Sequence, residues 1–411
     1  MRPEDVRVEI DLRSSIAPAI PPPRRFRQKI CARLRLERPF ARLSLDIWQD
    51  RERLMDRKQP VGGAQPEEKG AVSAAKVLVV IPCLNERAHI ENLIAEMLGI
   101  TAGLDRLIAV ADGGSTDGTV EILAAIARRE PCVRVISNPR KIQSAGVNLA
   151  VRAFGEGRQW LVRIDAHARY PKHYVTSLIA EARRTGAASV VVSMVSQGTT
   201  SFERAVAAVQ NSLLGAGGSP HRRSGKAEFV DHGHHALFDS QRFLAAGGYD
   251  ESLSHNEDAE FDIRLSRAGG KIWLTREVDI VYFPRSTPVA LYRQYVNYGR
   301  GRAKTILRHR TTPKLRQMLP ACVAPAILAL PLAPWIPLAG VPALFWSVAC
   351  LLFGARLGLR AGRRCALVAG FAAMTIHTGW SVGFWLELLA RLIPRAGTPA
   401  IGSFGAEDAH S

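Results

Sequence analysis

Two short stretches constrain the fold more than any other part of the chain. Residues 76–86 (KVLVVIPCLNE) and 107–119 (LIAVADGGSTDGT) each begin with an unbroken apolar run rich in β-branched residues and then stop at polar and small residues. An apolar run without alternation is typical of a strand buried on both faces, as in a parallel sheet. A helical pattern follows each run. The two stretches therefore predict consecutive βα units with a ligand crevice at the carboxyl ends of the strands.

Three further apolar runs continue this alternation. The strands are predicted at 133–137, 160–164 and 190–194, and the helices at 89–98, 120–129, 143–154 and 173–184. Five parallel-type strands alternating with helices predict a three-layer α/β sandwich. After Gly198 the alternation stops. A helix near 202–214 leads into a polar, basic loop at 215–226, which is long enough to be a mobile lid.

The charge balance leaves two classes of partner open. The 411 residues carry a formal net charge of +18, which favours either nucleic acid or an anionic membrane surface. No charged residue occurs between Arg316 and Arg356, and a second uncharged run covers 365–386. Nucleic-acid binding would need a basic groove with interleaved aromatic residues, whereas many basic residues here flank apolar runs. We therefore expect a membrane partner and no nucleic acid.

The apolar runs predict a membrane domain at 317–390. The run at 317–355 is too long for one crossing and contains several prolines, so it fits a helical hairpin that turns near 335–340. A third span is predicted at 365–386, followed by a tail at 391–411. Basic residues flank both ends of the hairpin, which places both ends in the cytoplasm. The soluble domain at 75–310 should then face the cytoplasm and the tail should lie outside.

The first 74 residues allow two interpretations. They are basic and rich in proline and arginine, and residues 24–48 mix arginine with apolar residues at loosely helical spacing. This segment could be an amphipathic helix on the anionic inner face of the membrane. It could equally be a disordered, solvated tail. No chemistry is assigned to it.

The first candidate site is the DGGSTDGT motif. An aspartate at a strand end, here Asp112, can bind a base or a ribose, and the glycines after it let the backbone turn sharply. The second half of the motif is also typical of an ordinary helix N-cap turn. The dinucleotide fingerprint GxGxxG is absent, and the acidic residue precedes the glycines.

The second candidate site is the end of the strand at 160–164. Asp165 and His167 are two residues apart, so their side chains share one face of an extended strand. Carboxylate and imidazole suit a divalent cation, Mn²⁺ or Mg²⁺, that bridges a diphosphate. A capping aspartate followed by an unrelated histidine is the alternative.

Histidines and acids supply the remaining candidates. His232, His234 and His235 surround a glycine and could complete a metal shell, contact an acceptor, or pack as polar residues. Glu257 and Asp258 open a helical pattern, where a carboxylate is either a general base or simply a favourable charge at a helix start. Two arginines near the membrane domain, Arg300 and Arg302, could hold phosphates or lipid headgroups.

The order and spacing of these motifs carry a family resemblance. Residues 76–302 resemble the inverting family 2 glycosyltransferases through 82–86 (PCLNE), 112–118 (DGGSTDG), Asp165-Ala-His167 and Glu257-Asp258. The blocks at 163–168, 231–235 and 256–260, with the C-terminal spans, are similar to bacterial succinoglycan-type exopolysaccharide glucosyltransferases. The resemblance implies the GT-A type nucleotide-diphospho-sugar transferase fold, a mixed, mostly parallel sheet between helices, with C-terminal transmembrane helices.

The same resemblance implies roles for the motif residues. Asp165 would hold Mn²⁺ or Mg²⁺ on the diphosphate, with His167 in place of the usual second acid, and Asp258, next to Glu257, would be the catalytic base. The nucleotide-sugar site would consist of Pro82, Asn85, Glu86, Asp112, Gly114, Asp165, Arg300 and Arg302. The acceptor side would include His232, His234 and His235.

The implied reaction is the inverting transfer of glucose from a UDP-sugar to a polyprenyl-diphosphate-linked saccharide. It would take place at the bacterial inner membrane, on a multi-pass protein, with other exopolysaccharide assembly proteins as candidate partners. The family's Gln-x-x-Arg-Trp block is degraded here to Gln294…Tyr298-Gly-Arg300, which favours addition of one sugar over polymerisation. The alternatives are a polyprenyl-phosphate glycosyltransferase, a polysaccharide synthase of the same fold, and an inactive membrane scaffold.

Overall fold

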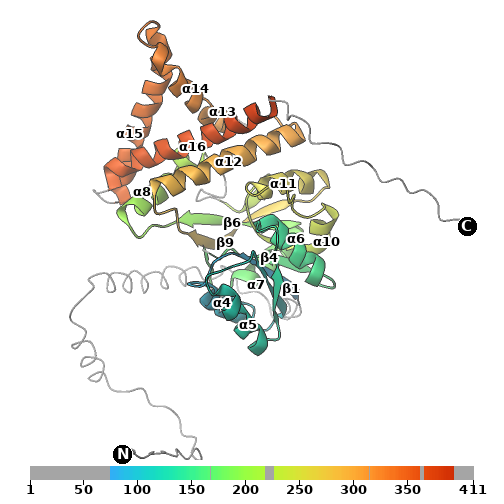
Figure 1. The fold of residues 1–411 in the computed structure, drawn as a ribbon. Helices are drawn as coiled ribbons and strands as arrows, with labels where there is room; N and C mark the ends of the chain where they lie inside the picture. Colours follow the sequence, from blue (N-terminus) through green and yellow to red (C-terminus); the bar gives the residue numbers. More distant parts are fainter. Residues whose placement is uncertain (1–74, 167, 218–225, 314, 362–364, 393–411) are drawn as a thin grey trace, which may run out of the picture. The chain divides into compact units, whose positions relative to one another are not determined.

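The computed structural model describes residues 75–166, 168–217, 226–313, 315–361 and 365–392 (Figure 1). These residues all belong to one compact unit, 60–411. Several predictions fall outside the described residues: the N-terminal segment 1–74, the metal ligand His167, most of the predicted lid and the tail beyond residue 392. We refer to residues 76–309 as the sheet body and to residues 315–392 as the C-terminal helices.

The first half of the sheet body has the predicted βα order. Strands β1 (Lys76–Cys83), β2 (Asp105–Asp112), β3 (Val133–Ser137) and β4 (Trp160–Arg163) are parallel and lie in the order β3-β2-β1-β4. The connecting helices are α4 (Ile90–Ile100), α5 (Thr119–Arg129) and α6 (Gln143–Phe154). In β1, Val77 to Ile81 are at most 1% exposed, as expected of a strand covered on both faces.

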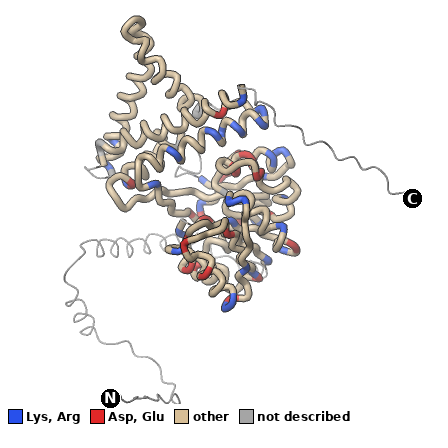
Figure 2. Tube along the Cα trace, viewed as in Figure 1, with Lys and Arg blue, Asp and Glu red and all other residues tan. Residues whose placement is uncertain are grey.

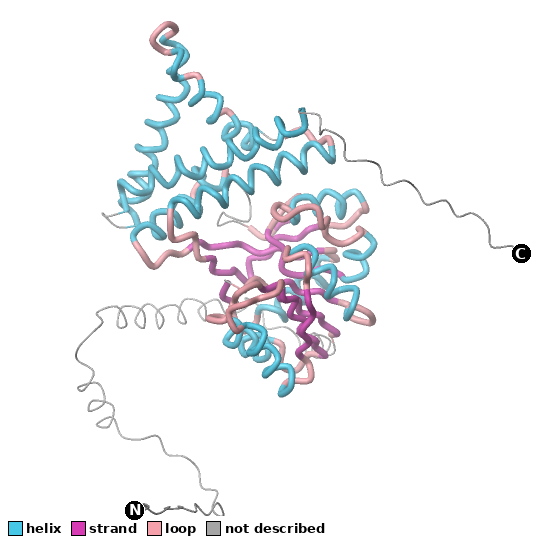
Figure 3. The backbone as a smooth tube through the Cα atoms, in the orientation of Figure 1, coloured by secondary structure: helices cyan, strands magenta, loops and turns pink. Residues whose placement is uncertain are grey.

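The second half makes the sheet mixed. Strand β8 (His234–Asp239) is antiparallel to both β4 and β6 (Ser189–Ser196), and β9 (Ile272–Tyr282) is parallel to β6. Short strands β5 (Ala168–Arg169) and β7 (Glu228–Val230) add to β9. The helices of this half are α7 (Tyr174–Thr185), α8 (Ser201–Gln210), α9 (Leu213–Ala216), α10 (Ser240–Ala245) and α11 (Glu257–Arg267). Figure 3 shows the sheet as one magenta layer between helices.

Helices cover both faces of the sheet and create two cores. Alternate residues of β1 point to opposite sides: Val79 packs with α4, α5 and α7, whereas Val80 packs with α6, α10 and α11. The second core contains four aromatic rings in mutual contact, from Phe238, Phe243, Tyr249 and Phe261. The predicted three-layer α/β architecture is therefore confirmed.

Helix α12 (Pro288–His309) closes the sheet body and carries the C-terminal helices. These are α13 (Leu315–Ala321), α14 (Val323–Leu328), α15 (Val341–Ala361) and α16 (Ala366–Leu392), with 3₁₀ turns at Leu330–Leu332 and Pro337–Gly340. In Figure 1, α14 and α15 form a hairpin above α16, which lies beside α12. Within the described residues one helix, Pro337–Arg360, is long and apolar enough to cross a membrane, and 17% of its apolar window is buried.

Helices α12 and α16 approach each other closely because glycines line their contact. A Cβ atom on Gly299 of α12 would lie 2.0 Å from the carbonyl oxygen of Trp380, and one on Gly383 of α16 would lie 2.0 Å from that of Val296. Gly379, one turn before Gly383, faces Tyr292 in the same way. Small residues four apart on one face let two helix backbones meet. Larger side chains would force them apart.

This contact gives a stability prediction. Gly383→Ala should destabilise the protein by roughly 1–3 kcal/mol, because the added methyl group overpacks a backbone contact that cannot yield. The matched control is Gly99→Ala in α4, where the added methyl group has open space and should raise helix stability slightly. Thermal unfolding of both variants in detergent measures the difference. Equal melting temperatures for the two variants would contradict the packing described for α12 and α16.

Candidate active site

The strand ends meet a large cavity. Its volume is about 990 Å³, and its wall includes the carboxyl ends of β1 and β4, the start of α11 and one side of α12. The sequence-predicted residues on this wall are Pro82, Glu86, Asp165, His232, His234, Glu257, Asp258 and Arg302. The cavity continues to Pro320 of α13 and to His377 and Trp380 of α16. One continuous space therefore connects the strand ends with the C-terminal helices.

The loop after β2 is organised by Asp112. Its carboxylate accepts hydrogen bonds from the Gly114 N–H at 2.9 Å, the Ser115 N–H at 3.0 Å and the Ser115 hydroxyl at 2.5 Å. Asn85, in the left-handed region at φ 58°, donates its N–H to the Ser115 hydroxyl and accepts from the Thr116 N–H. These bonds fasten the β1 and β2 loops together. Asp112 is 6% exposed, and its carboxylate accepts these hydrogen bonds from its own loop.

Four predicted site residues do not line the cavity. Asn85, Asp112, Gly114 and Arg300 are all described, and none of them is part of the cavity wall. The first three shape the loop that borders the wall at Pro82 and Glu86. Arg300 lies on the exposed side of α12, two residues from Arg302, and residues two apart do not share a helix face.

A buried arginine holds the acidic residues together. Arg163 of β4 is 5% exposed, and its guanidinium lies 2.6 Å from Asp258, 3.4 Å from Asp165 and 3.7 Å from Glu257. Burial alone would lower the pKa of Arg163, but these carboxylates raise it well above the usual range. The cation is therefore permanent. Carboxylates from a strand end and from a helix start share this one charge.

The orientation of Asp258 is fixed at one oxygen. Its Oδ1 accepts hydrogen bonds from Arg163 Nη1 at 2.6 Å and from the Tyr249 hydroxyl at 2.7 Å. Its Oδ2 lies 4.0 Å from Nδ1 of His234. The aromatic core around Tyr249 positions that hydroxyl, so the packing of the second core sets the carboxylate's direction.

The side chain of Glu257 is more deeply buried than that of its neighbour Asp258. As a whole residue, Glu257 is 7% exposed, and burial together with the charge of Asp258 raises its pKa to about 7. The helix start that carries both acids is tied to α12, because the Asn256 side chain donates to the Thr305 hydroxyl at 2.8 Å. A carboxylic acid whose pKa lies near neutral pH is suited to acid–base chemistry.

His234 is the histidine at the centre of the site. Its Nε2 lies 3.4 Å from Oδ2 of Asp165, so the imidazole stands between Asp165 and Asp258. His232 also faces the cavity, but its Nδ1 is 2.6 Å from the buried carboxylate of Asp262. The side chain of His235 lies outside the described residues. The sequence motif therefore contributes one imidazole between the two key acids.

Comparisons with known proteins give the family. The model described as "Glycosyl transferase family 2" matches residues 78–241, and "Glycosyl transferase family group 2" matches 160–359. The succinoglycan biosynthesis protein ExoA of Rhizobium meliloti (strain 1021) is 48% identical over 318 residues, covering 77% of this chain and 96% of ExoA. The chain belongs to the family 2 glycosyltransferases. A solved structure of a mannosyltransferase from Pyrobaculum calidifontis, in complex with GDP-Man and Mn²⁺, is 20% identical to this chain, with a TM-score of 0.47. The match covers 75% of this chain and 87% of the mannosyltransferase chain.

Asp165 and His234 are the candidate metal ligands in the described part of this glycosyltransferase. No group of three or more histidine, cysteine, aspartate or glutamate side chains among the described residues could hold an ion. The pair is Asp165 and His234, a carboxylate and an imidazole, which suits Mn²⁺. His167 lies outside the described residues, so its role as a ligand stays a prediction.

Sequence reasoning missed three residues on the cavity wall. Arg163 was not predicted as a site residue, although a charged residue inside an otherwise apolar strand is itself a signal. Gln143, at the start of α6, donates to Asp165 Oδ1 at 2.8 Å and accepts from Arg163. Lys141, whose φ is 58°, lies against Gly114. No sequence pattern indicated the last two.

The raised pKa of Glu257 gives a pH prediction. The folded pKa of about 7 exceeds the ordinary 4.5, so the group's contribution to stability is fully present below pH 4.5 and is lost as pH rises through 7. Glu257→Gln should remove this dependence, which amounts to at most about 3 kcal/mol. The check is thermal unfolding of both proteins from pH 5 to 8.

Exposed Glu121→Gln, on α5, is the matched control and should follow the parent protein. If the melting temperatures of the parent and Glu257→Gln change in parallel across this range, Glu257 has no raised pKa.

Proposed function

We propose that this glycosyltransferase moves one glucose from a UDP-sugar to a polyprenyl-diphosphate-linked saccharide, with inversion, in succinoglycan-type exopolysaccharide biosynthesis. The observation that carries the proposal is the approach of Asp165 and Asp258 to one another, with His234 between them, in a cavity at the strand ends. The identity to ExoA, which spans nearly all of that protein, supports the pathway.

The donor occupies the strand ends in this proposal. Pro82 and Glu86 border the uridine, and Asp112 shapes the loop beneath it through Gly114 and Ser115. Asp165 and His234 would hold a divalent cation, Mn²⁺ or Mg²⁺. When bound, the cation would neutralise charge on the diphosphate leaving group. Lys141 and Arg302 are further cations on the same cavity wall.

Asp258 is the general base. It takes the proton of the acceptor hydroxyl, which attacks the anomeric carbon on the face opposite UDP, and a single displacement inverts the configuration. Arg163 and Tyr249 fix the carboxylate from behind through Oδ1, so that Oδ2 is turned toward His234 and the cavity. The side chain of Glu257 is less exposed, at 9% against 15% for Asp258. It is a buried neighbour of the base that lies 3.7 Å from Arg163.

The acceptor reaches the base from the C-terminal helices. The cavity is continuous from Asp258 past Tyr295 and Tyr298 of α12 to Trp380 of α16. An acceptor whose lipid stays in the membrane would enter from this side, where exposed apolar side chains gather on α14 and α15. Location at the bacterial cytoplasmic membrane is part of the same proposal.

A donor screen tests the proposed function. Purified protein in detergent is incubated with a lipid-linked saccharide extract and with UDP-glucose, UDP-galactose, UDP-N-acetylglucosamine or GDP-mannose, each carrying a radiolabel. We expect transfer from UDP-glucose to a lipid-linked oligosaccharide lengthened by one sugar. A labelled lipid monophosphate sugar, a long polymer, or no product from any donor would each overturn the proposal.

Asp258→Asn should reduce transfer by roughly 10²–10⁴-fold, because the amide cannot accept the hydroxyl proton. Binding of UDP should stay within about twofold of the parent protein, since Asp258 does not contact the nucleotide in this proposal. Initial rates and UDP titration calorimetry measure the two effects. Asp105→Asn, at the opposite end of β2 from Asp112, is the matched control. Retained turnover in Asp258→Asn would remove this residue from the role of base.

Asp165→Ala should abolish the part of UDP-glucose affinity that depends on a divalent cation. Calorimetry with Mn²⁺ and with EDTA measures that part directly, without relying on turnover. The parent protein should lose affinity in EDTA, and the variant should bind equally weakly under both conditions. Parent affinity that is unaffected by EDTA would contradict the metal site.

A further inference from the structure

Helix α16 has one face on the sheet body along most of its length. The contact runs parallel to α12, from Gly379 against Tyr292 to Phe384 and Leu388 against Ala303 and Ile306. The buried face of α16 also includes Ala369, Ala372, Ala373 and Ile376, all at most 2% exposed. This contact is therefore not confined to one end of the helix.

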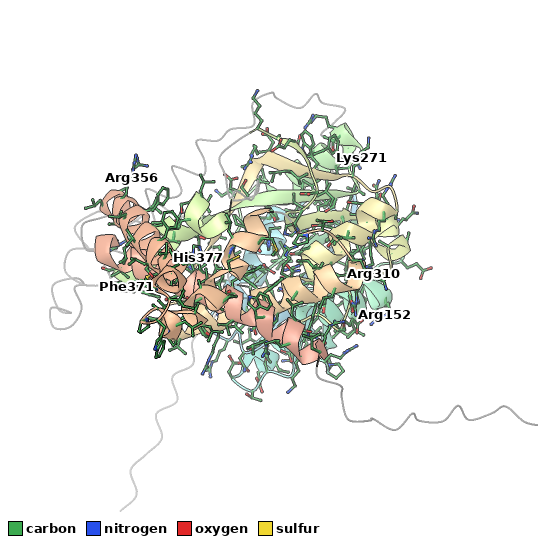
Figure 4. All side chains as sticks on the ribbon, turned by 90° about the horizontal axis from the view of Figure 1, so that it is seen from above. Arg152, Lys271, Arg310, Arg356, Phe371 and His377 are labelled. Carbon is green, nitrogen blue, oxygen red and sulfur yellow. The ribbon has the colours of Figure 1, made fainter. Side chains whose placement is uncertain are left out.

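The opposite face of α16 is apolar and exposed at its two ends, whereas its middle, at Met374, Thr375 and Thr378, is half-buried and lines a small cavity with the hairpin. Its members follow helical spacing and are Phe371 (61% exposed), Trp385 (37%), Leu386 (43%), Leu389 (50%) and Leu392 (76%). Figure 4 labels Phe371 on this helix together with His377, which faces the cavity. A helix that packs on protein with one face and exposes apolar side chains on the other is suited to the surface layer of a bilayer.

Helix α12 prevents α16 from crossing the membrane. It carries Arg293, Arg300, Arg302, Lys304 and Arg308. If α16 stood across the hydrocarbon, the α12 segment beside it would enter with it, at roughly 2.5–3.5 kcal/mol for each arginine or lysine near the centre. Gly301 and Thr305 also join α12 to the start of α11, so α12 cannot leave the sheet body.

The hairpin begins and ends on α16. Ala321 of α13 accepts hydrogen bonds from the Ser381 hydroxyl and from Trp385 Nε1, at 2.9 and 2.7 Å. On the other arm, Trp346 of α15 donates to His377 Nδ1 at 3.2 Å. From Trp346 to the turn at Pro337 the chain rises only ~15 Å, about half of a ~30 Å hydrocarbon layer. The part of the hairpin that extends beyond its contacts with α16 is therefore shorter than a crossing needs.

Charge divides the C-terminal helices in the same way. No charged residue occurs at 317–355, and the tip is exposed and apolar, with Trp335 and Leu338 each 78% exposed. Basic residues resume at Arg356 and Arg360 near the base of α15 and continue along α12. Figure 2 shows the hairpin without coloured positions and the blue positions below it. This distribution matches an apolar wedge above an anionic headgroup layer.

We propose that this glycosyltransferase is monotopic. The hairpin 318–345 enters one leaflet and returns, α16 lies in the plane of that leaflet, and the end of α16 stays on the side of the sheet body. The proposal rests on the membrane location within the proposed function and is independent of donor and acceptor. It replaces the sequence-based prediction of a third crossing with an external tail.

Single-cysteine labelling tests the proposal. The six native cysteines are replaced, and one cysteine is introduced as Leu392→Cys at the end of α16, Leu338→Cys at the hairpin tip, or Glu121→Cys on the sheet body. Bacterial spheroplasts are treated with a membrane-impermeant maleimide before and after permeabilisation. We expect Leu392→Cys to label like Glu121→Cys, only after permeabilisation, and Leu338→Cys to resist labelling from outside.

External labelling of Leu392→Cys while Glu121→Cys is protected would show that α16 crosses and would overturn the proposal. External labelling of Leu338→Cys would show that the hairpin spans the membrane and would also overturn the proposal. Recovery of the protein outside the membrane fraction would overturn the proposal as well. A second test uses fusions to the chain with its native cysteines. If the end of α16 lies on the side of the sheet body, a fluorescent protein fused to the C-terminus should fluoresce, and alkaline phosphatase fused there should be inactive. Neither readout uses sugar transfer, so a failed donor screen would leave the topology result intact.

Discussion

One buried cation organises the catalytic end of this glycosyltransferase. Arg163 enters the interior on a strand, where an isolated charge would be strongly unfavourable, and the fold satisfies it with Asp165, Glu257 and Asp258. These acids come from a strand end and from a helix nearly a hundred residues later. Because the arginine stays protonated, it attracts carboxylates from both elements to the same point. Electrostatic attraction therefore helps to hold the site together.

The parts of the fold that sequence predicted are those in which one local pattern determines one element. Unbroken apolar runs gave β1, β2 and β4, because only a doubly covered strand needs such a run. Strand β8 was missed for the opposite reason. It begins with His234 and His235, so it lacks the unbroken apolar run of a buried strand, although it pairs with β4 and β6. A long-range antiparallel insertion of this kind has no local signature.

The candidate site shows the same division. Asp165, at a strand end, and Asp258, at a helix start, were predicted from motifs and do share a cavity. Asp112 has a motif of the same quality, yet its carboxylate is bonded within its own loop. An aspartate followed by glycines satisfies a turn and a ligand equally well. Gln143 came with no signal at all, because its contact with Asp165 depends on where the sheet places α6.

Hydropathy cannot distinguish a helix that faces lipid from one that packs on protein, and α16 both exposes apolar side chains and packs on α12. Its glycines at 379 and 383 look like the packing motif of a membrane helix, but the partner they meet is the arginine-bearing α12. The same glycines bring Trp380 and His377 to the cavity wall, so an apolar segment lines part of the candidate site. Packing this close also connects α16 to the start of α11: α12 contacts the helix start that holds Asp258 through Thr305 and Asn256. Under the proposed function, a change in the position of α16 would therefore be transmitted to Asp258 through two contacts.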